Sequence, residues 1–130
     1  MTDNVDPLDE LFGDSDIEPF VLKKMLTDKL KKYVELYRDG TILFTNEWEK
    51  LNLRGKLLAY LLARKALFLS KAIEAEAATL AEIENDTNLK SNSIRPTLGA
   101  LSNERLIRKS DQDGSTAYQI PDSLVPKATI

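Results

Sequence analysis

Basic and small polar side chains gather between residues 90 and 109, and side chains of these types can form hydrogen bonds with a nucleic acid. An arginine such as Arg95 pairs with guanine or with a phosphate, and asparagines such as Asn92 and Asn103 pair with adenine. Lysine and hydroxyl side chains hold phosphates without recognising bases. The candidate contacts are Lys90, Ser91, Asn92, Ser93, Arg95, Pro96, Thr97, Asn103, Arg108 and Lys109.

Catalytic and metal chemistry have few candidates in this composition. The chain contains no histidine and no cysteine, so the commonest general base, the thiol nucleophiles and the usual zinc ligands are missing. It also lacks a glycine-rich phosphate loop. The stretch Asp111-Gln112-Asp113-Gly114 carries two carboxylates, but its glycine comes two positions too early for a calcium-binding EF-hand loop. We therefore expect no enzyme, no cofactor and no metal site.

Two short helices are expected to position the candidate contacts. Thr79 and Glu82 have the spacing of a capping box, so a helix is predicted from Leu80 to Asp86, with a tight turn at 87–89. The second helix is predicted to begin with Ser93 as its N-cap. Pro96 would then occupy the third helical position, where the N–H that proline lacks has no partner to lose.

A long helix and a hairpin complete the predicted unit. The stretch from Leu53 to Lys71 is apolar over most of a helical surface, which predicts a central helix. Strands are expected at 106–109 and 117–120, joined by a turn at 110–116 that contains Asp-Gly and ended by Pro121. A long helix, two short helices and a β-hairpin in this order form a winged helix-turn-helix.

The same residues resemble a known superfamily. The runs 78–83, 91–101 and 103–107, followed by a glycine-containing hairpin, are similar to the winged helix-turn-helix DNA-binding domains of archaeal, bacterial and viral regulators. The resemblance covers residues 51–121. It implies that the second short helix enters the major groove with its N-terminal residues at the base edges.

The residues before this domain are expected to form a tail and an extension. Residues 1–22 hold seven acids and no base, and 1–16 are predicted to be a disordered acidic tail. Within it, Leu8, Leu11 and Phe12 have the spacing of one helical face, which suits either a segment that folds in a partner's groove or a solubilising tail.

An amphipathic helix is predicted from Pro19 to Arg38, with a basic ridge on its solvent side, and a short strand at 41–45. The ridge consists of Lys24, Lys31 and Arg38. The expected fold class is thus mostly α with a small β-hairpin. The winged helix-turn-helix at 51–121 is preceded by the helix and strand of 17–50 and followed by a C-terminal tail at 122–130.

The charge distribution permits nucleic-acid binding despite a net charge of −3, because the chain from Lys23 onward contains 18 basic and 14 acidic residues. We expect a sequence-specific double-stranded DNA-binding transcriptional regulator that is a homodimer, with a protein partner for its acidic segment. The alternative is a protein–protein interaction module in a larger assembly. The small residues Pro96, Gly99 and Ala100 and the acidic hairpin tip favour that alternative. Since the chain shows neither a signal peptide nor an apolar span, we expect no membrane association and a cytoplasmic location.

Overall fold

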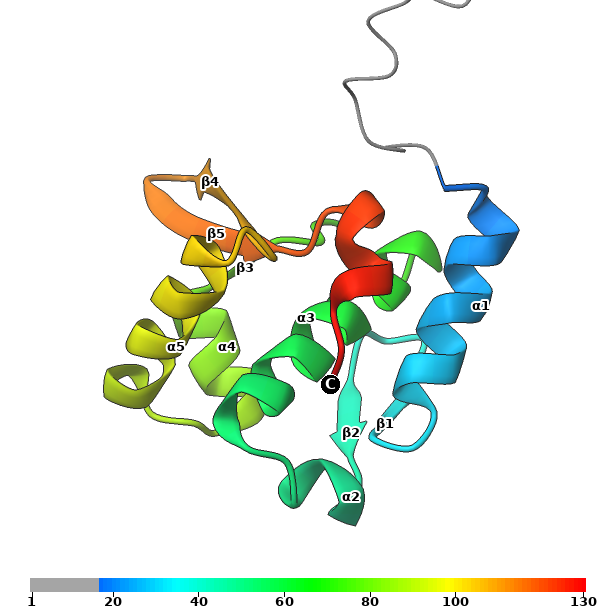
Figure 1. Cartoon of the computed structure of the whole chain (residues 1–130), viewed down its shortest axis with the longest axis horizontal. Helices are drawn as coiled ribbons and strands as arrows, with labels where there is room; N and C mark the ends of the chain where they lie inside the picture. Colours follow the sequence, from blue (N-terminus) through cyan, green and yellow to red (C-terminus); the bar gives the residue numbers. More distant parts are fainter. Residues whose placement is uncertain (1–16) are drawn as a thin grey trace, which may run out of the picture.

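The computed structural model describes residues 17–130, which combine several helices with two small antiparallel sheets (Figure 1). The acidic tail predicted at 1–16 lies outside the described residues. None of the helices within 17–130 is long and apolar enough to cross a membrane. The elements are α1 (Pro19–Leu30), β1 (Val34–Leu36), β2 (Ile42–Phe44), α2 (Asn46–Glu49), α3 (Leu53–Leu69), β3 (Ala78–Thr79), α4 (Leu80–Thr87), α5 (Ser91–Asn103), β4 (Arg108–Gln112), β5 (Ser115–Gln119) and the 3-10 helix η2 (Asp122–Lys127).

Helix α3 lies in the middle of the molecule, with α1 on one side and α4 and α5 on the other (Figure 1). Asn52 caps it by accepting a hydrogen bond from the backbone N–H of Gly55 at 2.8 Å. Most of its residues from Leu57 to Leu67 are buried, as expected for a helix that is apolar on almost every face. One continuous cluster of buried residues joins α1, α3, α5 and the C-terminal segment.

Helix α1 is shorter than predicted, because the helix expected to run from Pro19 to Arg38 ends at Leu30. The chain then forms the hairpin β1–β2, in which Val34 faces Phe44 and Leu36 faces Ile42. In β1 the inward Val34 and Leu36 alternate with the exposed Glu35, which is the two-residue period of a strand. The hairpin pairing replaces the helical hydrogen bonds of this stretch, and Arg38 therefore does not extend a ridge with Lys24 and Lys31.

The hairpin turn and the short α2 helix hold this sheet in place. Gly40 has a φ of 93°, a backbone conformation that favours glycine. Trp48 of α2 is buried, and its ring stacks on Phe44 with centroids 4.1 Å apart. Its indole N–H donates a hydrogen bond to the Lys56 carbonyl of α3 at 3.3 Å, so the β1–β2 hairpin is anchored on the central helix.

The three strands of the second sheet lie in the order β3-β5-β4. The predicted seven-residue turn at 110–116 is wrong, because β4 and β5 extend into it and leave a two-residue turn at Asp113 and Gly114. Both turn residues have positive φ, 52° and 83°, as a type I′ hairpin turn requires. Such a turn matches the twist of the strands, so pairing continues to the tip. The predicted strand 106–109 is accordingly shifted to Arg108–Gln112.

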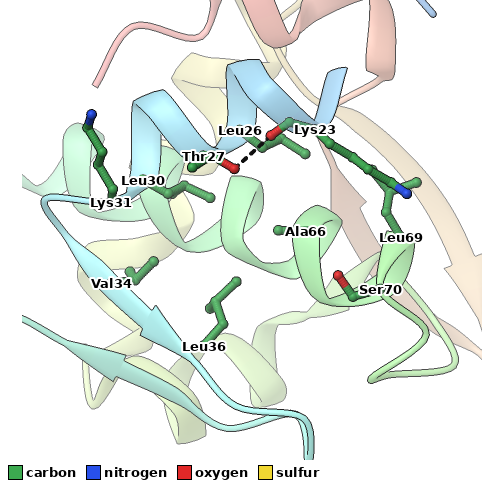
Figure 2. Close-up of a pocket in the computed structure, with 10 residues that line it drawn as sticks. All are labelled: Lys23, Leu26, Thr27, Leu30, Lys31, Val34, Leu36, Ala66, Leu69 and Ser70. Carbon is green, nitrogen blue, oxygen red and sulfur yellow. Dashed lines mark hydrogen bonds between the residues drawn. The ribbon is translucent and has the colours of Figure 1, made fainter. Parts of the chain in front are cut away.

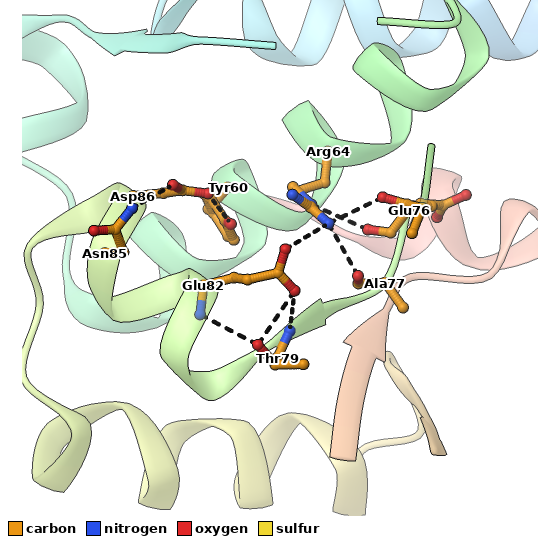
Figure 3. Close-up of polar contacts among 9 residues, drawn as sticks. Tyr60, Arg64, Glu76, Ala77, Thr79, Glu82, Asn85 and Asp86 are labelled. Atoms are coloured by element: carbon orange, nitrogen blue, oxygen red, sulfur yellow. Dashed lines mark hydrogen bonds and ion pairs between the residues drawn. The ribbon is translucent and has the colours of Figure 1, made fainter. Parts of the chain in front are cut away.

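Two buried cationic side chains of α3, Lys65 and Arg64, bind residues 75–77 before β3 and Asp122 of η2. The Lys65 ammonium group is fully buried and lies 2.6 Å from Glu76 and 2.5 Å from Asp122 of η2. Arg64 donates hydrogen bonds to the carbonyls of residues 75, 76 and 77, just before β3 (Figure 3). Burial raises the pKa of the Glu76 carboxyl, and the hydrogen bond from Lys65 opposes that rise.

The C-terminal segment, predicted as a tail, contains η2 and packs against α1. Val125 is fully buried, and the Lys29 ammonium group of α1 donates a hydrogen bond to the Ala128 carbonyl at 3.3 Å.

Candidate nucleic-acid interface

The start of α4 is fixed by the capping box that the sequence predicts. The Thr79 hydroxyl accepts from the backbone N–H of Glu82 at 3.2 Å, and the Glu82 carboxylate accepts from the backbone N–H of Thr79 at 3.0 Å. Arg64 of α3 lies 3.6 Å from the same carboxylate (Figure 3). The cap therefore attaches the first turn of α4 to the central helix.

The conformation of Asn88 and a hydrogen bond from α3 fix the point where α4 ends and the turn to α5 begins. Asn88 adopts the left-handed conformation with a φ of 62°, which ends α4. The Tyr60 hydroxyl of α3 donates a hydrogen bond to Asp86 at 2.6 Å (Figure 3). The pKa of the Tyr60 phenol is raised, mainly by burial and secondly by this hydrogen bond, so Tyr60 remains a donor at neutral pH. The end of α4 is thus attached to the central helix.

Helix α5 begins earlier than predicted. Its first residue is Ser91 and its N-cap is Lys90, so the expected start at Ser93 is wrong and Pro96 lies inside the helix. The backbone N–H groups of Ser93 and Ile94 both donate to the Lys90 carbonyl at 3.0 Å. An earlier start adds these bonds. It leaves the carbonyl of Asn92 without a donor from Pro96, at a position where Asn92 is exposed to solvent.

The inner and outer faces of α5 differ sharply. Ile94, Leu98 and Leu101 are buried against the core. The outer face carries Asn92, Pro96 and Asn103, which are exposed. Gly99 lies beside them, and a β-carbon built at Gly99 would meet nothing within 4 Å.

Proline and glycine are the two residues least suited to a helix interior. Here Pro96 is exposed, and no neighbouring atom requires the lack of a side chain at Gly99. Together they leave the outer face of α5 flat and free of long side chains. Such a surface permits another molecule to approach the helix backbone closely.

Arg95 projects to one side of this face, into a shallow cleft between α5, the first turn of α4 and the strand β5. The cleft also contains the polar side chains Thr79, Ser115, Thr116 and Tyr118. Among residues 17–130, no carboxylate forms an ion pair with Arg95. Its guanidinium group is therefore free to bind an external acceptor.

Pro96 and Thr97 line a different cleft, on the opposite side of α5, together with Asn52 and Arg54 at the start of α3. The Thr97 hydroxyl donates to the Ser93 carbonyl at 3.3 Å. Arg54 forms an ion pair with Glu104, the C-cap of α5, at 2.5 Å. Three of the predicted contacts thus line clefts, Arg95 on one side of α5 and Pro96 with Thr97 on the other, and Asn92 and Asn103 are exposed on the ridge between them. The clefts do not include Lys90, Ser91, Ser93, Arg108 or Lys109.

The two predicted basic residues of the hairpin point to opposite faces of the sheet, and only Lys109 shares the face of Tyr118, which lines the Arg95 cleft. Lys109 pairs with Tyr118 across the sheet, and directly paired residues point to the same face. Arg108 precedes Lys109 in the strand and therefore points to the other face. Asp111 is paired with Thr116, so it shares the face of Lys109 and places a carboxylate near the tip of the hairpin.

Sequence reasoning missed the hydroxyl groups of β5, Ser115 and Thr116, which line the cleft with Arg95. They were expected to belong to the turn. The signal that places them is Asp113-Gly114, because a two-residue type I′ turn fixes the register of both strands. The part of the chain that the structure describes contains no cluster of carboxylates that could hold a metal ion.

No family model, no curated protein and no solved structure matches this chain.

Proposed function

We propose that α3, α4, α5 and the β4–β5 hairpin form a winged helix-turn-helix, and that the protein is a sequence-specific double-stranded DNA-binding protein that regulates transcription. The observation that carries the proposal is the outer face of α5. It joins two residues that weaken the helix, Pro96 and Gly99, to exposed amide side chains and an arginine without an internal partner.

A major groove admits an α-helix, and close approach brings short side chains within reach of base edges. Asn92 and Asn103 extend from the ridge of α5, where an amide can form two hydrogen bonds with adenine. Arg95 lies to the side, where it can reach a guanine or the adjacent phosphate. Removal of a bidentate arginine contact costs about 1–3 kcal/mol of specific binding.

Phosphate contacts are proposed for the residues around the Arg95 cleft. Lys90, the N-cap of α5, and Lys109, on the same sheet face as Tyr118, supply positive charge. The hydroxyl groups of Ser115 and Thr116, which line the cleft, supply donors. Two-fold symmetric operators are bound by symmetric dimers. A homodimer is accordingly part of the proposal, as is a role in binding rather than catalysis.

The test is selection of bound sequences from a random double-stranded DNA pool with the full chain at near-physiological salt. An enriched motif is expected, and its affinity should fall with salt by a slope of about −0.9 per phosphate contact. Arg95→Ala should weaken binding to that motif and relax one base position. Arg38→Ala is the matched control, because Arg38 is also an exposed arginine but lies at the β1–β2 turn.

A protein-interaction module is the second candidate, and the acidic residues Asp111 and Asp113 on the hairpin favour it, because phosphates repel carboxylates. This candidate predicts no enriched motif. It also predicts equal DNA binding by the wild type, Arg95→Ala and Arg38→Ala, and that result would refute the DNA-binding proposal.

A further inference from the structure

An apolar groove lies between α1, β1 and α3, on the side of the molecule away from α5 (Figure 2). Its volume is 380 Å³, within the range of about 300–1,000 Å³ that is usual for ligand sites. The floor and walls are aliphatic and consist of Leu26, Leu30, Val34, Leu36, Ala66 and Leu69.

The rim of the groove is basic. Lys23 of α1 and Lys31, the C-cap of α1, lie at the two ends of the groove, with Thr27 between them (Figure 2). Neither lysine forms an ion pair with any residue of 17–130. Phe20 precedes Lys23 by three residues, so it lies on the same side of α1, and 71% of its surface is exposed. The groove and its margin thus offer apolar surface flanked by unpaired positive charge.

We propose that residues 6–12 of the same chain occupy this groove. The segment reads Asp6-Pro7-Leu8-Asp9-Glu10-Leu11-Phe12, and it has the complementary pattern of apolar residues between carboxylates. Leu8, Leu11 and Phe12 supply apolar side chains for the aliphatic lining. Asp9 and Glu10 supply carboxylates that can form ion pairs with Lys23 and Lys31. Residues 1–16 contain six acids and no base, so no charge in this part of the chain opposes the contact.

The chain is long enough for this contact. Seven residue steps separate Phe12 from Pro19, and an extended chain covers about 23 Å in that number of steps. Helix α1 has 12 residues, which at about 1.5 Å per residue gives a length of about 18 Å. The segment can therefore turn back at the start of α1 and run along the groove from Lys23 toward Lys31.

The covalent connection favours the segment of the same chain over other occupants. A short flexible linker gives a tethered group an effective concentration in the millimolar range. The same segment on a second copy of the chain, or on another protein, lacks this advantage at ordinary protein concentrations. The contact should also weaken with salt, because it pairs exposed charges.

The test uses the full chain, whose lack of cysteine allows a single spin label to be attached through Asn4→Cys. In the ¹⁵N-labelled protein, the label should broaden the amide signals of Leu26, Leu30 and Leu69. The loss of intensity should be independent of protein concentration, and it should diminish in high salt. Adding Leu11→Glu and Phe12→Glu should restore the signals, as should Lys23→Glu with Lys31→Glu.

The matched control is Thr2→Glu with Ser15→Glu, which adds the same two charges on either side of residues 6–12 but keeps the apolar residues of that segment. This control should leave the broadening intact. The proposal would be overturned if no signal beyond the first residues of α1 were broadened, or if the broadening survived Leu11→Glu and Phe12→Glu. It would also be overturned if, in a mixed sample, a spin-labelled copy without ¹⁵N broadened the signals of ¹⁵N protein that carries no spin label. The last result would assign the groove to a segment of another molecule.

Discussion

The substitution Gly99→Ala provides a test of the arrangement of α5, because it separates folding from binding. Gly99 lies in the ninth position of a 13-residue helix and has an ordinary helical φ. A β-carbon at this position meets no atom within 4 Å. The added methyl group therefore causes no clash and finds no packing partner.

The expected effect on stability follows from helix propensity alone. Glycine in a helix interior is about 0.5–1 kcal/mol less favourable than alanine, because it loses more backbone freedom on folding. Gly99→Ala should increase the free energy of unfolding by that amount. For a chain of 130 residues, the melting temperature should rise by about 2–5 °C.

The assay is urea unfolding of the full chain, followed by circular dichroism, with Gly55→Ala as the control. At Gly55 a β-carbon would lie 3.1 Å from the Asn52 side-chain oxygen, which caps α3. Gly55→Ala should therefore lower stability, because the cap must move. The same chemical change is thus expected to have opposite effects in the two helices.

A loss of stability in Gly99→Ala, or no change, would refute the assignment of an open outer face to α5. The DNA-binding proposal adds a second expectation for the same variant. A methyl group between α5 and the major groove of the DNA should weaken binding to the selected motif, although the fold is more stable. An unchanged affinity would mean that this face of α5 does not approach the ligand.

Two further predictions concern contacts that position α4 and the C-terminal segment. Lys65→Met should destabilise the fold by about 3–5 kcal/mol, since it leaves the buried Glu76 without its cation; Glu76→Gln in addition should restore much of the loss in a double-mutant cycle. Without the ammonium group, burial holds the pKa of Glu76 above its unfolded value, so the deficit should be full at high pH and should shrink as the pH falls through the raised pKa. A deficit that grows on acidification would contradict this reasoning. Thr79→Ala should cost about 0.5–2 kcal/mol in thermal unfolding by removing the N-cap of α4, whereas equal stability would show that the cap hydrogen bonds contribute nothing.

Local signals predicted several elements well. The apolar surface of residues 53–71 predicted the central helix, which ends at Leu69, and the spacing of Thr79 and Glu82 predicted the start of α4, because a capping box depends only on four consecutive residues. Ile94, Leu98 and Leu101 have the spacing of one helical face in the sequence, and all three are buried on α5. These predictions succeeded since the physical cause lies within one or two helical turns.

Other elements depend on partners that are distant in the sequence. The stretch from Tyr33 to Tyr37 fits a helical stripe, yet pairing with residues 42–44 makes it a strand. Strand β3 has only two residues and exists through its hydrogen bonds with β5, about 40 positions later. The charges of Arg64 and Lys65 interrupted an apolar helix in the sequence, and only their contacts with residues 75–77 and Asp122 explain their burial.

The candidate site shows the same division. The sequence by itself determined which residue types are present, that histidine and cysteine chemistry is absent, and which residues α5 buries, because composition and helical period are local properties. Only the tertiary structure decided that Arg95 shares a cleft with β5 while Thr97 faces α3. It also decided that Lys109, and not Arg108, shares a sheet face with Tyr118 of that cleft, because the face of a strand residue follows from the register of its pairing.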